Sequence, residues 1–451
     1  MRLAKARVHF IGVGGIGMCG LAELLHNMGA QVTGSDASEN ANTVRLVQMG
    51  VTVYLGHAAE QVGDADVVVF SSAVRDTNVE YKEARRRKIP LIRRAEALAE
   101  IMHLKRGLAI AGTHGKTTTT SLTASVFLAA ALDPTIVVGG RLDIIKSTAQ
   151  LGQGDWLIAE ADESDGSFTS LAPEIVIITN IDNDHLDHYK TFANLEKAFV
   201  EFASRIPFYG VAIVCGDDPT LKKMFSSFGK RWISYGTSQD CDYVLKKLAD
   251  HWLVTCEGEK VGELRPAMPG LHNALNSLAA VLGGMEAGIP FATGARAVHE
   301  FGGVDRRFQH KACIRGVDYY DDYGHHPTEV RAVLNGFKEK FPTRRLVTVF
   351  QPHRYSRTQI CWQDFLSCFA QADVLFVLDI YPAGEAPIQG VTGQELAAKI
   401  EHSDCHFLSR KGDPTLQAVR ELLQSGDILL TLGAGDISKM GDQLMDLQAK
   451  S

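Results

Sequence analysis

Residues 109–117 read Ala-Ile-Ala-Gly-Thr-His-Gly-Lys-Thr, and three more threonines follow at 118–120. The apolar run Leu108–Ala111 predicts a short buried strand, and the periodic segment Ser121–Leu132 predicts a helix. A strand, a glycine-rich turn and a helix that opens with Lys-Thr form a phosphate-binding loop, because backbone N–H groups and the helix dipole converge on an anion. The residues predicted to bind the nucleotide are Gly112, Thr113, His114, Gly115, Lys116, Thr117 and Thr118.

Within this loop, Lys116 is expected to reach the terminal phosphates, and the Thr117 hydroxyl suits Mg²⁺. The strict P-loop pattern has a glycine five residues before the Gly-Lys pair, where this chain has Ile110. An ordinary turn with a solvated lysine is therefore the alternative. A lysine opposes the dipole at a helix start, and consecutive threonines are poor helix formers. Both local costs are explained if a phosphate and a metal bind there.

The composition is that of a globular protein, with 451 residues and 45% hydrophobic residues. The net charge of −7 argues against general nucleic-acid binding. No apolar run reaches the length of a membrane span, and the N-terminus lacks the apolar core of a signal peptide. The eight cysteines form no C-x-x-C pair, so neither a zinc site nor a disulfide framework is indicated. We expect a cytoplasmic protein without membrane or nucleic-acid partners.

A second glycine-rich loop lies near the N-terminus. The predicted strand Val8–Ile11 leads into Gly12–Gly17, which satisfies G-x-G-x-x-G, and a predicted helix, Met18–Met28, follows. Asp36 ends the next strand, 24 residues after Gly12, where an acid can bind a ribose hydroxyl. The pattern indicates a diphosphate at a helix N-terminus but does not identify the nucleotide. An NAD-dependent oxidoreductase, or tight packing without a ligand, would give the same motif.

The order of predicted strands and helices indicates an α/β protein of three domains. The predicted domains are residues 1–104, which are Rossmann-like, residues 105–302, which are P-loop ATPase-like with a mostly parallel sheet, and residues 303–451, which are again Rossmann-like. Strands of such sheets bind ligands at their carboxyl ends. Ser71 and Ser72 follow the predicted strand Val67–Phe70 and are candidates for that reason.

Acidic residues follow two predicted strands of the central domain. Glu160 ends the strand Trp156–Ala159 and opens the run Glu-Ala-Asp-Glu-Ser-Asp. An acid at this place holds Mg²⁺ in P-loop proteins, although Glu163 is an alternative that the sequence cannot separate from Glu160. His185 lies in a second polar run after the strand Ile175–Ile178 and is a candidate for binding a metal or a phosphate.

Two further clusters point to ligand binding. His272, Asn273 and Asn276 share one face at the start of a predicted helix, and side-chain amides can contact a purine edge, although asparagine is also a common helix cap. In the third domain, Arg354 and Arg357 follow the strand Leu346–Phe350. Two arginines three residues apart suit a carboxylate or a phosphate.

Taken together, these motifs resemble the Mur ligases over essentially the whole chain. The segments that carry the resemblance are Gly12–Gly17, Gly112–Thr118, Glu160–Asp165, Asp184-His185, His272–Asn276, Arg306–Phe308, Asp322–Glu329, Gln351–Thr358 and Tyr381–Ile388. The Gly-Thr-x-Gly-Lys-Thr form is the family's own phosphate-binding loop, which explains the departure at Ile110.

The resemblance implies an ATP-dependent ligase of cell-wall precursor synthesis that joins L-alanine to the carboxylate of UDP-N-acetylmuramate through an acyl phosphate. It implies that Lys116, His185, Arg354 and Arg357 act in catalysis, and that Thr117, Glu160 and His185 hold Mg²⁺. It places His272, Asn273 and Asn276 at the adenine of ATP. It places Gly12, Gly14, Gly15, Gly17, Asp36, Ser71 and Ser72 at the UDP-sugar, and Tyr323, His325, Arg354 and Arg357 at the alanine. Some relatives carry a carbamylated lysine at the second metal, for which Lys197 is the candidate.

Two other functions remain to be compared with this one. A sister ligase attaches a recycled tripeptide to the same sugar nucleotide, but His353–Thr358 and Tyr381–Ile388 favour alanine. A nucleotide-binding sensor without catalysis is disfavoured by the presence of Lys116, Glu160 and His185.

Overall fold

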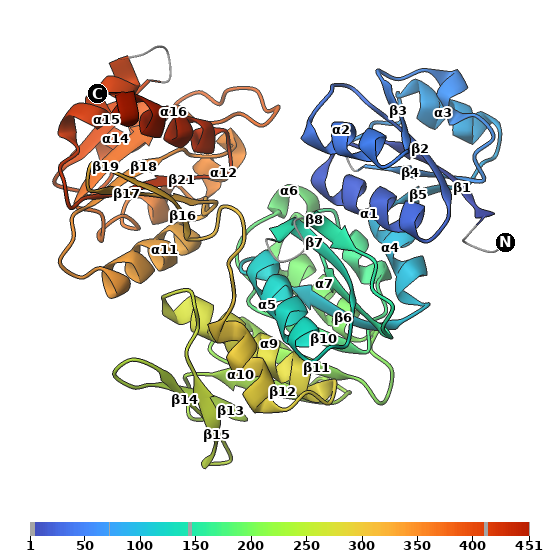
Figure 1. Ribbon diagram of the computed structural model, residues 1–451, viewed down its shortest axis with the longest axis horizontal. Helices are drawn as coiled ribbons and strands as arrows, with labels where there is room; N and C mark the ends of the chain where they lie inside the picture. The colour runs from blue at the N-terminus through green and yellow to red at the C-terminus, as the bar shows by residue number, and fades with distance from the viewer. Residues whose placement is uncertain (1–4, 72, 143–146, 410–413, 451) are drawn as a thin grey trace. The chain divides into compact units, whose positions relative to one another are not determined.

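The computed structural model describes residues 5–71, 73–142, 147–409 and 414–450, and its strands form three sheets (Figure 1). The chain divides into two compact units by its internal contacts. The first comprises Met1–Ala267 and Leu275–Gly302, and the second comprises Met268–Ala274 and Gly303–Ser451. The first unit holds two sheets and the second holds one, so the predicted α/β architecture is confirmed. None of the helices in these ranges combines the length and apolar character needed to cross a bilayer.

The first sheet is fully parallel, with strand order β3-β2-β1-β4-β5. Its strands are β1 (Arg7–Ile11), β2 (Gln31–Asp36), β3 (Thr52–Leu55), β4 (Val67–Phe70) and β5 (Leu91–Arg93). Its helices are α1 (Ile16–Asn27), α2 (Ala41–Gln48), α3 (Val79–Arg86) and α4 (Arg94–Met102), with the 3-10 turn η2 (Ala59–Val62). Because the strand order reverses between β1 and β4, the loops after these two strands border a ligand-binding crevice.

The central sheet has the order β15-β14-β13-β12-β11-β10-β6-β9-β7-β8 and is mostly parallel. Its strands are β6 (Arg106–Ala111), β7 (Thr135–Leu142), β8 (Ser147–Gln150), β9 (Trp156–Glu160), β10 (Ile175–Ile178), β11 (Val211–Cys215), β12 (Trp232–Gly236), β13 (Tyr243–Lys247), β14 (Trp252–Cys256) and β15 (Glu259–Leu264). Its helices are α5 (Lys116–Ala129), α6 (Leu186–Tyr189), α7 (Phe192–Ala203), α8 (Pro219–Phe225), α9 (Leu271–Glu286) and α10 (Phe291–His299), with η3 (Ser167–Ser170). Parallel strand β6 lies between β9 and β10, so the three polar runs that follow these strands meet at one edge.

The third sheet has the order β16-β17-β21-β18-β19-β20, and only its edge strand β16 is antiparallel. Its strands are β16 (Gln309–Ile314), β17 (Val317–Asp322), β18 (Leu346–Phe350), β19 (Val374–Leu378), β20 (Cys405–Leu408) and β21 (Ile428–Leu432). Its helices are α11 (Pro327–Lys340), α12 (Tyr355–Ile360), α13 (Trp362–Phe365), α14 (Gly393–Lys399), α15 (Pro414–Leu422) and α16 (Ile437–Lys450).

Alternate residues of the third sheet build a core on each of its faces. Tyr320 and Leu430 pack with α11 and α13, whereas their neighbours Tyr319 and Leu429 pack with α15 and α16. Figure 1 shows the strands of this sheet between α11 on one side and α15 and α16 on the other. This is the period of two that a strand imposes on its side chains.

Two helix limits depend on the folded structure. Helix α5 begins at Lys116, as the predicted Lys-Thr opening requires, and it includes Thr118–Ser121 because these residues are buried and their packing outweighs their weak helix propensity. In the third domain, α12 ends at Ile360 and α13 begins at Trp362, so the helical segment is broken at Cys361. The Cys361 thiol is buried 3.4 Å from His326 Nε2, and the turn there places Phe365 in the core.

Candidate active site

The glycine loop after β1 is held by the neighbouring strand β2. The carbonyl oxygen of Ser35 accepts hydrogen bonds from the N–H groups of Gly12 (2.8 Å) and Val13 (3.0 Å). The Asp36 carboxylate accepts one from the Gly14 N–H at 2.8 Å, and a Cβ on Gly14 would lie 2.8 Å from that same oxygen. Asp36 therefore braces the loop in the structure, and its predicted contact with a ribose stays a prediction.

The structure brings Gly15 and Ser71, which were also predicted for the UDP-sugar, to the same crevice. Gly15 caps α1, and the Ser71 N–H donates to the carbonyl oxygen of Ile11 at 3.2 Å. A Cβ on Gly12 would lie 3.3 Å from the Ser71 Cβ, so the ends of β1 and β4 are in contact. Ser72 lies outside the described residues.

The phosphate-binding loop between β6 and α5 depends on two glycines with positive φ. Gly112 has φ of +133°, and a Cβ there would lie 2.1 Å from Thr179 Oγ1. Gly115 has φ of +81°, and a Cβ there would lie 2.9 Å from Asn276 Oδ1. Glycine alone combines this backbone conformation with such close neighbours. The loop ends at the first turn of α5, whose N–H groups have no partners within the helix and are suited to bind an anion.

Residues after β10 hold this loop at His114. The Asn180 side chain accepts a hydrogen bond from the His114 N–H and donates one to the His114 carbonyl oxygen, both at 2.9 Å. The Thr179 hydroxyl donates to that same carbonyl oxygen at 2.6 Å. An oxygen of Asp182 lies 2.9 Å from His114 Nε2. These contacts fix both the backbone and the imidazole of His114.

Lys116, Glu163 and His185 form a group at the mouth of the loop. Lys116 Nζ donates to the carbonyl oxygen of Gly112 at 2.6 Å and to Glu163 Oε1 at 2.8 Å. His185 Nε2 lies 3.6 Å from that same carboxylate oxygen. Burial raises the pKa of Glu163 to about 7, although the charge of Lys116 acts in the opposite direction. Burial also disfavours the charge on Lys116, but the neighbouring acids outweigh it and raise the pKa of the lysine.

The two candidate acids, Glu160 and Glu163, have separate surroundings. Glu160 accepts a hydrogen bond from the Thr117 hydroxyl at 3.2 Å. Glu163 is fully buried, and its Oε2 atom has no hydrogen-bond partner in the part of the chain that the structure describes. An unpaired buried carboxylate oxygen is costly, and Mg²⁺ prefers oxygen ligands. The residues present therefore fit a divalent cation, with Glu163 added to the predicted ligands Thr117, Glu160 and His185.

The predicted adenine residues lie along α9. Asn276 is 7% exposed and packs against Gly115 of the phosphate-binding loop. His272 and Asn273 belong to the second unit, where the Asn273 side chain donates to the carbonyl oxygen of Pro269 at 2.8 Å. Burial lowers the pKa of His272 to about 4, so its imidazole is neutral at pH 7.

In the second unit, four rings form a continuous row. The ring centroids of Tyr323 and His325 are 5.4 Å apart, and those of His325 and His353 are 5.7 Å apart. His353 in turn stacks on Tyr381 at 5.5 Å with an interplanar angle of 9°. Tyr323 and His325 were predicted to bind the amino acid, and the structure places His353 and Tyr381 in the same row of rings. Burial lowers the pKa of His325 to about 3, so this imidazole is also neutral at pH 7.

The two predicted arginines lie beside this row. Arg357 Nη1 is 3.1 Å from His353 Nδ1, and the Arg354 N–H donates to the carbonyl oxygen of Tyr381 at 2.8 Å. Arg354 has φ of +67°, a strained conformation for a side chain of this size. Its Nε atom is buried without a hydrogen-bond partner among the described residues. The cluster therefore offers cationic N–H donors to a small anion such as a carboxylate.

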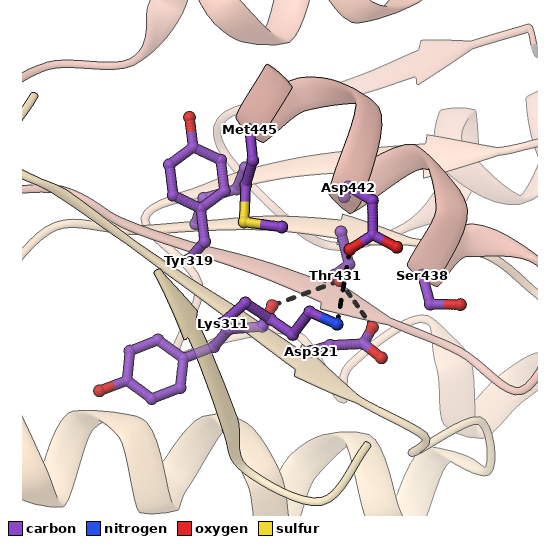
Figure 2. A pocket seen from close by; sticks show the side chains of 10 residues that line it. Lys311, Tyr319, Asp321, Thr431, Ser438, Asp442 and Met445 are labelled. Carbon is purple, nitrogen blue, oxygen red and sulfur yellow. Dashed lines mark hydrogen bonds and ion pairs between the residues drawn. The ribbon is translucent and has the colours of Figure 1, made fainter. Parts of the chain in front are cut away.

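A separate shallow hollow lies between α16 and the strands β16, β17 and β21 of the third sheet. Figure 2 shows Lys311 and Asp442 turned toward each other there, and they form an ion pair at 3.4 Å. The Thr431 hydroxyl donates to Asp321 at 2.7 Å. These polar groups already pair with one another, which disfavours this hollow as a ligand-binding site.

Asn180, Asp182, His353 and Tyr381 were not among the site residues predicted from the sequence. Each lies in a polar run that follows a strand, but the run alone does not reveal which member contacts the loop or the arginines. Lys197 lies on α7 and its side chain is exposed to solvent. Its role as a carbamylated metal ligand stays a prediction.

Three family models match the chain. "Mur ligase family, catalytic domain" matches residues 7–106, "Mur ligase middle domain" residues 110–283, and "Mur ligase, glutamate ligase domain" residues 306–435. The chain belongs to the Mur ligase family. The class that its fold and site define is that of the ATP-dependent ligases that form amide bonds.

Individual relatives narrow this class. The chain is 58% identical to a UDP-N-acetylmuramate--L-alanine ligase of Bdellovibrio bacteriovorus, covering 99% of this chain and 100% of the relative. It is 49% identical to a ligase of the same name from Syntrophotalea carbinolica, covering 97% of each. Among solved structures, the UDP-N-acetylmuramate-alanine ligase of Thermotoga maritima is similar, with a TM-score of 0.82 at 27% identity over 99% of this chain and 100% of that one.

Proposed function

We propose that this protein ligates L-alanine to the carboxylate of UDP-N-acetylmuramate, with ATP converted to ADP and phosphate, in peptidoglycan precursor synthesis. The relatives that carry this name match the chain from end to end. The observation that carries the chemistry is the group of Lys116, Glu163 and His185 at the mouth of a phosphate-binding loop. Family membership argues against an NAD-dependent oxidoreductase, the alternative that the first glycine loop leaves open.

In the first step, a carboxylate oxygen of the muramoyl group attacks the γ-phosphorus of ATP, and ADP leaves. Negative charge spreads over the transferring phosphoryl group, so a cation placed beside it lowers the barrier. Lys116 supplies that charge, because its Nζ atom is already held by the carbonyl oxygens of Gly112 and Thr113. Asn180 holds the loop in this conformation through two hydrogen bonds to the His114 backbone.

We propose that Thr117, Glu160, Glu163 and His185 hold Mg²⁺ for this step. Bound there, Mg²⁺ would supply positive charge to the phosphate oxygens. Glu163 contributes the oxygen that lacks another partner, and Tyr189 fixes its backbone by donating its hydroxyl to the Glu163 carbonyl oxygen at 2.6 Å.

In the second step, the amine of alanine attacks the acyl carbon, the acyl–oxygen bond breaks, and phosphate leaves. Arg354 and Arg357 bind the carboxylate of alanine, and Tyr323 and His325 border the same cluster. The neutral His325 adds no positive charge near the incoming amine. Because both reactants are held in place, the bimolecular reaction becomes effectively unimolecular.

We further propose that residues 1–104 bind the UDP-sugar, residues 105–302 bind ATP, with His272, Asn273 and Asn276 at the adenine, and residues 303–451 bind the amino acid. The limits of the matched family models support this division. A reducing cytoplasm suits the eight cysteines, all of which are free thiols.

Isotope transfer tests the acyl-phosphate route. UDP-N-acetylmuramate labelled with ¹⁸O in its carboxylate is incubated with ATP and L-alanine, and the released phosphate is analysed by mass spectrometry. One ¹⁸O atom per phosphate is expected, because the oxygen that attacks phosphorus leaves with it. Unlabelled phosphate alongside amide product would contradict this route.

A further inference from the structure

Arg94, at the start of α4, lies directly against the third glycine of the first loop. A Cβ on Gly17 would lie 2.6 Å from Arg94 Nη1 and 3.1 Å from its Cζ atom. In dinucleotide-binding proteins the third glycine lets a helix pack closely on a strand. In this chain it makes room for a guanidinium group at the first turn of α1.

Most of the donors of this guanidinium group are unused. Arg94 makes one hydrogen bond within the described ranges, from Nη2 to Asp162 Oδ2 at 3.3 Å. An arginine has five N–H donors, so further donors face the glycine loop or solvent. The side chain is 27% exposed, which leaves it accessible to a ligand.

The position is also unfavourable for a cation without a ligand. The first turn of α1 contains no acidic residue, and a helix N-terminus carries partial positive charge. A guanidinium group at that end is therefore repelled, and its ion pair with Asp162 at 3.3 Å offsets only part of this cost, whereas an anion bound at the loop would also interact favourably with the helix. Lys116 at the start of α5 presents the same combination in the ATP loop.

Asp162 connects Arg94 to the acidic run that follows β9. It lies between Glu160 and Glu163 in the sequence, and its carboxylate accepts the hydrogen bond from Arg94 Nη2 at 3.3 Å. Asp162 thus orients Arg94 from the side of the phosphate-transfer group while leaving the remaining donors free.

We infer that Arg94 is a substrate-binding residue that donates hydrogen bonds to the diphosphate of the UDP-sugar. This inference rests on the proposed function, because the diphosphate belongs to the proposed substrate. The proposed anion site has two parts, the backbone N–H groups of the glycine loop and the guanidinium group of Arg94. An arginine suits this role because its planar fork matches phosphate oxygens.

Two other roles for Arg94 make different predictions. If Arg94 only stabilises the packing of α4 against the acidic run after β9, its effect on ligand binding would depend on its ion pair with Asp162. As a contact to the muramoyl carboxylate, it would affect the complete substrate but not UDP. Binding of UDP and of UDP-N-acetylmuramate is therefore measured by calorimetry, without ATP, for the wild type and for Arg94→Ala, Arg94→Gln, Arg94→Lys and Asp162→Asn.

We expect Arg94→Ala and Arg94→Gln to weaken both ligands by the same factor, roughly tenfold to a hundredfold, the usual effect of losing a hydrogen bond to a charged group. Arg94→Lys keeps the charge without the fork and should lie in between. Asp162→Asn should change UDP affinity less than threefold. Arg94→Gln retains most of the side-chain bulk, so it carries the test if the alanine variant does not fold.

Unchanged UDP binding in Arg94→Ala and Arg94→Gln would overturn the inference, as would an equal loss in Asp162→Asn. A loss confined to UDP-N-acetylmuramate would move the contact to the muramoyl carboxylate and also overturn it. A wild-type protein that binds neither ligand would instead refute the proposed function itself.

Discussion

Replacing Asn180 by alanine should weaken ATP binding at the phosphate-binding loop, residues 112–117, and leave UDP-sugar binding at the glycine loop, residues 12–17, unchanged. The change removes two hydrogen bonds of 2.9 Å to His114. The His114 carbonyl oxygen keeps its bond from Thr179, but the His114 N–H loses its partner. An unsatisfied, partly buried donor and a lost hydrogen bond together amount to about 2 kcal/mol. If this energy holds the loop in its binding conformation, ATP affinity should fall by roughly thirtyfold.

The assay is calorimetric titration with a non-hydrolysable ATP analogue and Mg²⁺, with UDP-N-acetylmuramate as the internal reference. Asn183→Ala is the matched control, because Asn183 is exposed and lies only three residues further along the chain. We expect weaker analogue binding only in Asn180→Ala, with the sugar nucleotide unaffected in both variants. Equal analogue affinity for the two variants would refute the role assigned to Asn180.

Three further predictions concern the same two loops. Lys116→Ala should lower turnover by a hundredfold or more while circular dichroism stays unchanged, since the lost charge acts on the transferring phosphoryl group; turnover near the wild-type value would contradict this. Burial raises the pKa of Glu163 to about 7, so below that pH most of this carboxylate carries a proton, which competes with Mg²⁺ for it. The Mg²⁺ concentration for half-maximal activity should therefore rise as the pH falls from 8 to 6. Phosphate release titrated with Mg²⁺ at each pH measures this, and a Mg²⁺ requirement independent of pH would exclude Glu163 as a ligand. Gly14→Val places a side chain against Asn40 and Asp36, so it should raise the Michaelis constant for the UDP-sugar and not that for ATP; loss of ATP binding alone would mean that the two loops have the opposite roles.

Apolar strands and glycine loops could be predicted from the sequence because local pattern determines them. The predicted limits of Val67–Phe70, Ile175–Ile178 and Leu346–Phe350 match the structure, since each is a short apolar run that is buried or nearly so. The helical conformation of Thr118–Thr120 does not follow from local propensity in the same way. Thr118–Thr120 disfavour a helix locally, and only their burial in the folded domain makes them helical.

The site was predictable as a set of segments and not as a set of contacts. Glu160 and Glu163 both follow β9, but only the structure shows that Glu163 meets Lys116 and His185 while Glu160 meets Thr117. Arg94 is a similar case, because nothing in its sequence neighbourhood indicates that Gly17 leaves space for its guanidinium group. Such pairings join residues that are distant in sequence, so neither periodicity nor spacing encodes them.

The most direct measurement of the central claim is phosphate release with ATP, UDP-N-acetylmuramate and each of the twenty amino acids in turn, together with the tripeptide that the sister ligase uses. We predict release that requires both the sugar nucleotide and an amino acid, with L-alanine the best acceptor and one phosphate formed per amide. Release with the tripeptide in preference to L-alanine, or release that needs no sugar nucleotide, would contradict the account.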